Sequence, residues 1–159
     1  MAHSVELLFD ADAEAAIVAM WRRLDAAGLP SQLRVKSDTN RPHVTLLAAQ
    51  RISPDVDAPL RALAAALPLA CTVGAPVVFN GPRRTLARLI VPSAELLALH
   101  ERVYRLCLPH LTGEPFGHCR PAHWTAHATL GRRYTAAEIG AAFALDDTGL
   151  GSDLPARLV

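Results

Sequence analysis

The sequence has little lysine, few aromatic residues and no long apolar run. Lys36 is the only lysine among 16 basic residues, and the formal net charge is +1. A chain with this balance has no overall attraction for nucleic acid or anionic membranes, so an anion must be bound by a local basic site. No stretch of about 18 consecutive apolar residues occurs, and we therefore expect no membrane-spanning helix.

Cysteines are also scarce, and they form no recognisable pattern. Cys71, Cys107 and Cys119 are odd in number, and their spacing matches no disulfide or zinc motif. The first residues lack the basic segment and apolar core of a signal peptide. We expect a reduced, cytoplasmic protein that uses no metal and no other cofactor.

Apolar residues are numerous enough for a substantial core. The 159 residues are 51% hydrophobic, which suits a single domain over residues 1–159. Apolar runs bounded by turn residues predict strands near 4–10, 43–49, 70–79, 85–92 and 123–131. Helical spacing predicts helices that follow Asp10, Ser53, Ser93 and Thr135, and Thr135 with Glu138 predicts a capping box.

The connections indicate how these elements pair. Asn80-Gly81 predicts a hairpin between two of the strands, and we expect loops over 31–41 and 112–122. The tail from residue 149 predicts at most a short last strand. Hairpins combined with helical connections favour an α+β fold with largely antiparallel sheets.

One polar pattern occurs twice in otherwise apolar strands. Residues 43–46 (HVTL) and 127–130 (HATL) share the form His-x-Thr-Leu. In a chain of this composition, His-x-Thr alone is expected about 0.4 times by chance, yet it occurs in both copies and again at His123. Residues two apart in a strand share one face, so each copy places an imidazole beside a hydroxyl.

Two such pairs facing one cleft suit chemistry at a phosphate. An imidazole titrates near pH 6.5, so one histidine can act as a base while the other stays an acid. We expect His43 and His127 to have these catalytic roles, with Thr45 and Thr129 donating hydrogen bonds to phosphate oxygens. Arg132 is expected to neutralise the developing negative charge.

The two motifs resemble those of the 2H phosphoesterase superfamily, in particular its LigT-like group of RNA 2′,3′-cyclic phosphodiesterases and 2′-5′ RNA ligases. The first resembles the family over residues 42–46 and the second over 124–132, including Trp124 upstream and Arg132 downstream. The order of strands and helices is similar over nearly the whole chain. Ala126 stands where the family often has proline, and we expect the C-terminal strand to be short.

The resemblance implies a bilobal fold, in which two mainly antiparallel sheets are related by a pseudo-twofold around a central cleft with helices outside. It implies opening of a 2′,3′-cyclic phosphate on an RNA end or nucleotide to a 2′-phosphate, with 2′-5′ RNA ligation as the reverse reaction. We expect a monomer. In similar enzymes the first histidine protonates the leaving 3′-oxygen and the second activates water, although pseudo-symmetry leaves the two roles exchangeable.

Other interpretations of the same residues stay open. A binding module for RNA ends or nucleotides can keep such a cleft without turnover. A shifted register would move the second site to His123. Zinc ligation by His118, Cys119, His123 and His127 is disfavoured, because residues four apart in a strand lie about 13 Å from one another.

Two further residues are candidate substrate contacts. Arg41 flanks the first motif and can meet a phosphate, and Phe116 lies in a predicted loop and can stack on a base. Trp124 alternates away from His123 and His127 along the predicted strand, so we expect it to pack in the core.

Overall fold

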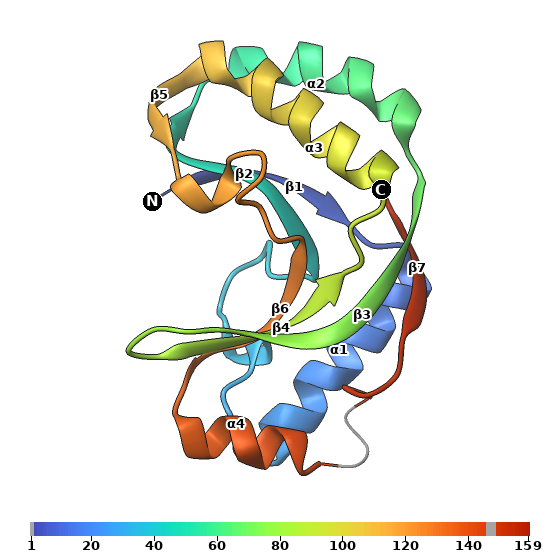
Figure 1. Ribbon diagram of the computed structural model, residues 1–159, viewed down its shortest axis with the longest axis vertical. Coiled ribbons are helices and arrows are strands. Elements are labelled where there is room, and N and C mark those ends of the chain that lie inside the picture. The colour runs from blue at the N-terminus through green and yellow to red at the C-terminus, as the bar shows by residue number, and fades with distance from the viewer. Residues whose placement is uncertain (1, 146–148) are drawn as a thin grey trace.

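The computed structural model describes residues 2–145 and 149–159 (Figure 1). Within these residues the strands and α-helices are, in chain order, β1 (His3–Leu8), α1 (Ala11–Ala26), β2 (His43–Ile52), α2 (Asp57–Leu63), β3 (Leu69–Phe79), β4 (Arg84–Ile90), α3 (Ala94–Cys107), β5 (Leu111–Pro115), β6 (His127–Tyr134), α4 (Ala136–Phe143) and β7 (Leu154–Leu158).

The strands form two antiparallel sheets. One has the order β1-β2-β5 and the other the order β6-β4-β3-β7. A bridge between Phe9 and Leu158 joins the end of β1 to β7, and Leu8 and Val159 exchange backbone hydrogen bonds of 3.0 and 2.9 Å. The two sheets are therefore connected along one side and curl towards each other (Figure 1).

The helices cover the outer faces of both sheets. α2 and α3 lie over the three-stranded sheet, and α1 and α4 lie under the four-stranded sheet (Figure 1). α1 follows β1 in the chain but packs on β6 and β7, whereas α3 follows β4 but packs on β2. The order β1-α1-β2-α2 is thus repeated as β4-α3-β6-α4, with β5 inserted between α3 and β6. This arrangement confirms the expected α+β fold with two lobes and outer helices.

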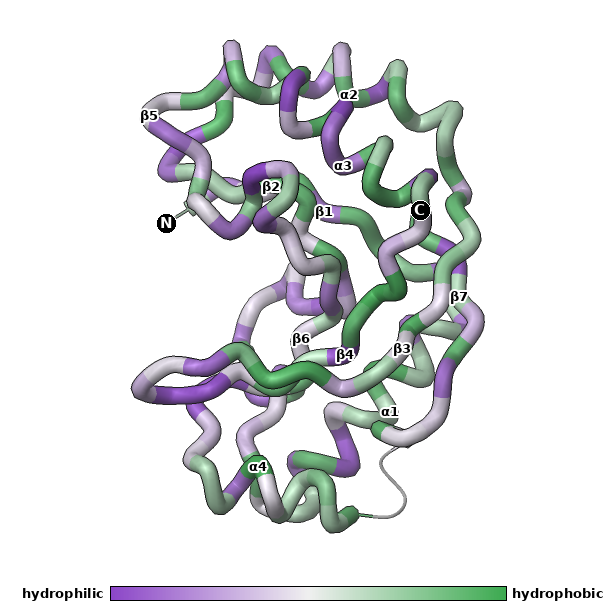
Figure 2. The backbone as a smooth tube through the Cα atoms, in the orientation of Figure 1, coloured by the Kyte–Doolittle hydropathy of each residue, from purple (hydrophilic) through white to green (hydrophobic). Residues whose placement is uncertain are grey.

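The two lobes also resemble each other in the side chains that their helices bury. Buried residues of α1 have the same spacing as those of α3, namely Ile17, Met20, Trp21 and Leu24 in one helix and Leu96, Leu99, His100 and Val103 in the other. Trp21 and His100 therefore occupy equivalent places. Along the β3–β4 hairpin, Figure 2 shows hydrophobic residues near the body of the protein and hydrophilic ones towards the tip.

The helix starts follow the sequence signals, although Ser53 caps the 3₁₀-helix that precedes α2 and Asp10 makes no cap hydrogen bond. Thr135 and Glu138 form the predicted capping box of α4, and the Ser93 hydroxyl accepts from the Leu96 backbone N–H at 3.1 Å. Asp10 precedes α1, but its carboxylate instead accepts from the Arg157 backbone N–H at 2.8 Å. Asp10 therefore ties β7 to the first lobe rather than capping the helix.

Two predicted boundaries are wrong. The segment 112–122, expected as a loop, contains most of β5, because β2 continues to Ile52 and pairs there with Leu111 and Thr112. The strand expected from residue 123 begins only at His127, because a turn precedes it, with the His123 backbone N–H donating to the Arg120 carbonyl at 3.0 Å. Both differences arise from long-range pairing and turn formation, which local periodicity does not report.

A short C-terminal strand is present, as expected. All five residues of β7 pair with Leu69–Val73 of β3. The segment before it is held by the fully buried guanidinium of Arg88, which donates to the carbonyls of Gly149 at 2.8 Å and Ser152 at 2.5 Å. These charge-assisted bonds satisfy the buried cation through backbone carbonyls.

Candidate active site

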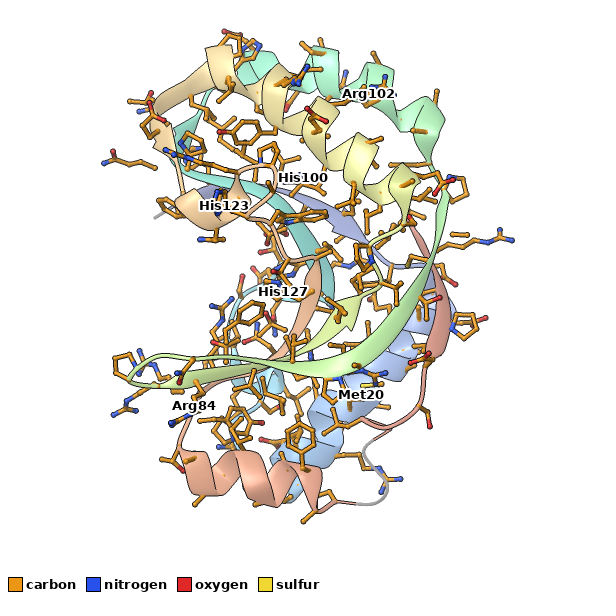
Figure 3. The ribbon with its side chains drawn as sticks, in the orientation of Figure 1. Met20, Arg84, His100, Arg102, His123 and His127 are labelled. Carbon is orange, nitrogen blue, oxygen red and sulfur yellow. The ribbon has the colours of Figure 1, made fainter. Side chains whose placement is uncertain are left out.

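A single cleft of about 810 Å³ lies between the two lobes and receives side chains from both sheets. Figure 3 shows His127 at the back of this opening, with His123 above it. The lining residues are Ala2, His3, Ser4, Glu6, His43, Thr45, Ala48, Phe79, Thr85, Phe116, His118, His123, Trp124, Thr125, His127 and Arg132. The cleft thus brings together both motif histidines, which lie 84 positions apart in the sequence.

The two histidines are held in the same way. Nδ1 of His43 donates to the Arg41 carbonyl at 2.8 Å, and Nδ1 of His127 donates to the Thr125 carbonyl at 2.7 Å. A carbonyl can only accept, so each Nδ1 carries a hydrogen. The fixed tautomer leaves Nε2 of each ring as the nitrogen that can exchange a proton with a ligand.

Each motif also contains a β-bulge at its leucine. On β2, Thr45 pairs with Glu6 and Leu47 pairs with Val5, so Leu46 is the extra residue. On β6, Thr129 pairs with Ala87 and Gly131 pairs with Leu86, so Leu130 is the extra residue. Both leucines are buried in the core. The leucine of His-x-Thr-Leu therefore marks a position where the strand shifts its register.

The bulge decides which later residue reaches the cleft. In an unbroken strand, Arg132 would face away from His127, because the two positions are an odd number of residues apart. The extra residue reverses this alternation, and Arg132 lines the cleft. On the other lobe the bulge at Leu46 likewise brings Ala48 into the cleft. Arg132 and Ala48 are thus equivalent positions with different side chains.

Indole groups bind the carbonyl that precedes each bulge. Trp124 Nε1 donates to the Thr45 carbonyl at 2.9 Å, and Trp21 Nε1 donates to the Thr129 carbonyl at 3.0 Å. Trp124 also stacks on His100 with ring centroids 3.9 Å apart. Because bulges disrupt the ladder, these bonds help to satisfy its backbone groups. Trp124 packs against the core, as expected, but also lines the cleft.

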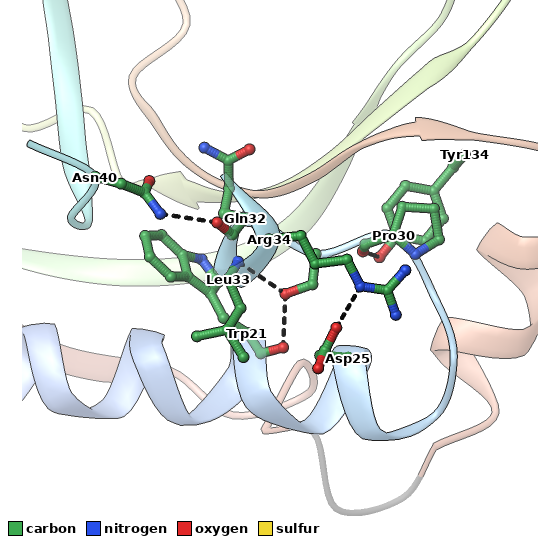
Figure 4. A network of polar contacts seen from close by, with 9 residues as sticks. Trp21, Asp25, Pro30, Gln32, Leu33, Arg34, Asn40 and Tyr134 are labelled. Carbon is green, nitrogen blue, oxygen red and sulfur yellow. Dashed lines mark hydrogen bonds and ion pairs between the residues drawn. The ribbon is translucent and has the colours of Figure 1, made fainter. Parts of the chain in front are cut away.

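The loop between α1 and β2 is fixed by polar contacts. Ser31 Oγ donates to the Trp21 carbonyl at 2.7 Å, and the Asn40 amide donates to the Gln32 carbonyl at 2.9 Å (Figure 4). Because this loop leads directly into His43, these bonds help to determine where the first motif begins.

The same loop is also anchored to β6. The Tyr134 hydroxyl donates to the Pro30 carbonyl, as Figure 4 shows. That carbonyl lies so close to Gly131 that a Cβ at this position would be 2.3 Å from the Pro30 oxygen. Only glycine fits at position 131 without a shift of the backbone, because the Pro30 carbonyl occupies the place of a side chain. Through it, the strand that carries His127 contacts the loop that precedes His43.

His127 lies in partly buried surroundings with positive neighbours. Its ring contacts Phe79, with centroids 4.5 Å apart. Burial is the main cause that lowers the pKa of His127, and the positive charges of Arg132, His118 and His43 lower it further, against the opposing hydrogen bond to Thr125. A lowered pKa keeps this ring neutral at pH 7, as a general base requires.

His43 lies beside an acidic group instead. Its Nε2 is 3.7 Å from Glu6 Oε1, and the side chains are 25% and 34% exposed. This separation exceeds hydrogen-bond length, but a carboxylate at such a distance attracts a protonated imidazole. The two motif histidines thus have charges of opposite sign as neighbours.

The remaining predicted site residues are not all in the cleft. Thr45 and Phe116 line it, and Phe116 is 41% exposed. Thr129 follows His127 on β6 but is 8% exposed and is not among the lining residues. Arg41 is not among the lining residues of the cleft: its carbonyl holds His43, but its side chain forms an ion pair with Glu14, and the residue lines a separate pocket.

The histidine and cysteine cluster does not form a metal site. Among residues 2–145 and 149–159, no group of three or more His, Cys, Asp or Glu side chains is arranged to hold a metal ion. Cys119 is buried, and burial raises the pKa of its thiol. His123 and His118 line the cleft from the segment before β6, so a shifted register on β6 does not apply to His123.

Several cleft residues carry no motif of their own. Ser4 and Glu6 enter from β1, and Phe79 and Thr85 enter from the β3–β4 hairpin. The sequence shows that Ser4 and Glu6 lie on the same face of their strand, because they are two residues apart. Whether that face points into the cleft depends on pairing with β2.

Among the described residues, no helix has both the length and the apolarity needed to cross a bilayer.

Comparison with known proteins agrees with the geometry. A family model described as the 2'-5' RNA ligase superfamily matches residues 9–157, which include both motifs. No curated protein matches the chain. The chain therefore belongs to the 2'-5' RNA ligase superfamily, the 2H phosphoesterase or LigT-like proteins that its two motifs resemble.

Proposed function

We propose that the protein is a metal-independent phosphodiesterase that opens 2′,3′-cyclic phosphates on RNA ends or nucleotides and leaves a 2′-phosphate. The observation that carries this proposal is the cleft in which both histidines present Nε2 while Nδ1 is bound to a backbone carbonyl. A base and an acid on one phosphorus centre are what cyclic phosphate hydrolysis requires.

The surroundings of the two rings support a division of roles. Nε2 of His127, whose pKa is lowered mainly by burial, takes a proton from the attacking water. A bond forms from that oxygen to phosphorus, and the bond from phosphorus to the 3′-oxygen breaks. Nε2 of His43 donates its proton to the 3′-oxygen. The product carries a 2′-phosphate, and exchange with solvent restores both rings.

Phosphate stabilisation is assigned to the hydroxyls and the arginine. Thr45 and Arg132 line the cleft, and Thr129 lies two residues beyond His127 on the same strand. Their hydroxyl and guanidinium groups donate to the phosphate oxygens as charge develops. Phe116, which is exposed in the cleft, offers a face on which a base can stack.

One chain is sufficient for this chemistry in our proposal. Both histidines come from the same polypeptide, one from each sheet, so the two lobes act as a single domain over residues 1–159 and as a monomer. In 2′-5′ ligation a 5′-hydroxyl takes the place of water, so His127 again accepts the proton of the nucleophile and His43 again donates one to the 3′-oxygen. By microscopic reversibility the two histidines exchange roles when ligation is reversed, that is, when the 2′-5′ bond is cleaved to restore the cyclic phosphate.

The test is hydrolysis of a panel of 2′,3′-cyclic nucleotides and short RNAs with cyclic ends, in EDTA, with the phosphate position in the product determined. We expect a 2′-phosphate. His43→Ala and His127→Ala should each reduce kcat/KM by about 10³-fold, with circular dichroism unchanged. His110→Ala, which changes a histidine outside the cleft, is the matched control and should retain activity.

Two results would contradict the proposal. Near-normal turnover in either cleft variant would exclude a two-histidine mechanism. Tight binding of cyclic nucleotides by the unmodified protein without any turnover would instead identify a non-catalytic binding module.

A further inference from the structure

The cleft contains a carboxylate where a phosphate is expected to bind. Its lining includes five of the seven histidines (His3, His43, His118, His123 and His127) and one arginine, Arg132. Of the described residues that line the cleft, Glu6 has the only carboxylate. A negative charge opposes binding of an anionic substrate, so its presence here calls for a compensating role.

Glu6 is aimed at the nitrogen that exchanges protons. Its Oε1 lies 3.7 Å from Nε2 of His43, while Nδ1 of that ring is bound to the Arg41 carbonyl. The separation is too long for a hydrogen bond, so the carboxylate attracts a proton on Nε2 without accepting a hydrogen bond from it. A leaving oxygen can therefore approach the same N–H.

The carboxylate is itself held in place. Ser4 Oγ donates to Glu6 Oε1 at 2.7 Å, and both side chains belong to β1. Glu6 pairs with Thr45 in the sheet, next to the bulge at Leu46. Its position relative to His43 thus depends on the same register shift that forms the motif.

The second lobe has no such group. The position equivalent to Glu6 is Ala87, which pairs with Thr129, and the position equivalent to Ala48 is Arg132. The other charged or titratable groups around the two rings are His3 on β1, Arg132 on β6, and His118 and His123 in the segment before β6. Among the lining residues, the acidic charge is therefore confined to the side of His43.

We propose that Glu6 is a positioning residue that keeps the proton on Nε2 of His43 and so fixes which of the two equivalent histidines is the acid. This inference rests on the proposed function of the cleft. It does not follow from the repeated motif, because the two copies of His-x-Thr-Leu are interchangeable and only their neighbours differ.

The first test is the pH dependence of kcat/KM for Glu6→Gln. Without the carboxylate, the proposed acid lacks the negative charge that lies 3.7 Å from its Nε2, and the alkaline limb of the profile should move to lower pH. Activity at pH 8 should fall about fivefold, as expected for loss of one attraction across 4 Å in a solvated site. Activity at pH 6 should change less than about twofold, and KM for the anionic substrate should not rise.

Glu101→Gln is the matched control, because it makes the same change in an exposed ion pair with Arg105 on α3. Its profile should coincide with that of the unmodified protein. A uniform loss of activity in Glu6→Gln at all pH values would indicate a structural role and overturn the proposal. A rise in KM with an unchanged kcat would overturn it too, because it would make Glu6 a substrate contact.

A second measurement needs no turnover. The ring resonances of His43 in the ligand-free protein, assigned with His43→Ala, can be followed by NMR as pH changes. In Glu6→Gln the His43 resonance should change at lower pH than in the unmodified protein, and in Glu101→Gln it should not. Identical titrations would overturn the role of Glu6. A protein that lacks hydrolysis but shows this difference would overturn the proposed function alone.

Discussion

The strand around His43 and the strand around His127 have a common construction and different neighbours. In both, Nδ1 donates to the carbonyl two residues earlier, the motif leucine forms a bulge, and an indole binds the threonine carbonyl. Beside His43, however, lies the carboxylate of Glu6. Around His127, burial and the positive charges of Arg132, His118 and His43 act on the ring.

This difference separates two properties of the cleft. The repeated features give each ring the same orientation and tautomer, which a symmetric site would need for either direction of proton transfer. The unequal surroundings distinguish the two rings, because burial and positive neighbours lower the pKa of His127 whereas a carboxylate lies beside His43. In our proposal this difference gives the site its direction. Each of the following experiments alters one lobe and uses the other as its reference.

The largest effect concerns the leaving group. On a 2′,3′-cyclic nucleotide we expect His43→Ala and His127→Ala to lose about 10³-fold in kcat/KM. On an aryl phosphodiester, whose phenolate leaves without protonation, His43→Ala should recover to within about tenfold of the unmodified protein, because an acid contributes little there. His127→Ala should stay impaired, because water must still be activated. Recovery of His127→Ala instead would reverse the assignment of acid and base.

The two lobes also differ in the space around the residue that follows each bulge. Leu47 and Gly131 occupy equivalent positions, but only Gly131 lies under the Pro30 carbonyl. Gly131→Ala should lower the free energy of unfolding by about 3 kcal/mol, because backbone atoms must move. Chemical denaturation checks this value. Gly140→Ala in α4, where nothing lies within 4 Å of an added Cβ, should be neutral or stabilising.

Much of the symmetric part of the site could be predicted from the sequence. The repeated His-x-Thr-Leu pattern identified both histidines, because strand alternation and the family resemblance are local properties of those segments. The capping box of Thr135 and Glu138 was equally local and is confirmed. The two-lobed α+β fold followed from the order of elements and is also confirmed.

The asymmetric part could not be predicted in the same way. Glu6 is distant in sequence from both motifs, and it reaches His43 only through the register of β1 on β2. The approach of Arg132 to the cleft depends on a bulge that simple alternation does not contain. His123 was expected in a strand, but a turn at Arg120 holds it in the segment before β6. These features depend on pairing between distant residues.

Arg132 offers a third way to alter one lobe. Arg132→Gln should reduce kcat/KM about 30-fold at pH 7, because one charged donor to the phosphate is lost. Burial is the main cause that lowers the pKa of His127, and Arg132 adds to it. Removing that charge should raise the pKa of His127 towards its ordinary value. Because the base must be neutral, the acid limb of the rate profile should then move to higher pH.

The control for Arg132→Gln is Arg133→Gln, which changes an exposed neighbour outside the cleft lining. Its rate and its acid limb should match those of the unmodified protein. An unshifted acid limb in Arg132→Gln, together with the lower rate, would show that Arg132 binds phosphate without tuning His127. An equal shift in both variants would mean that the protein's overall charge, not Arg132, sets the limb.

The smallest expected difference lies between the two indoles. Trp21→Phe and Trp124→Phe each remove a hydrogen bond to a threonine carbonyl while keeping an aromatic ring. Trp21 is buried, so the Thr129 carbonyl loses a donor that water cannot readily replace, and we expect a loss of about 2 kcal/mol in stability. Trp124 is only partly buried at the cleft, where water can substitute, and about 0.5 kcal/mol is expected.

Catalysis should rank these two variants in the opposite order. Thr45 lines the cleft, whereas Thr129 is nearly buried, so a shift of the backbone at Thr45 moves a group that, in our proposal, contacts the substrate. Denaturation curves and kcat/KM measured on the same two proteins separate the effects. If Trp21→Phe reduced both quantities more than Trp124→Phe, the indole that donates to the Thr129 carbonyl of β6 would control the geometry of His127 as well as the stability of the lobe. The two bulges would then be equivalent in form but not in what they position.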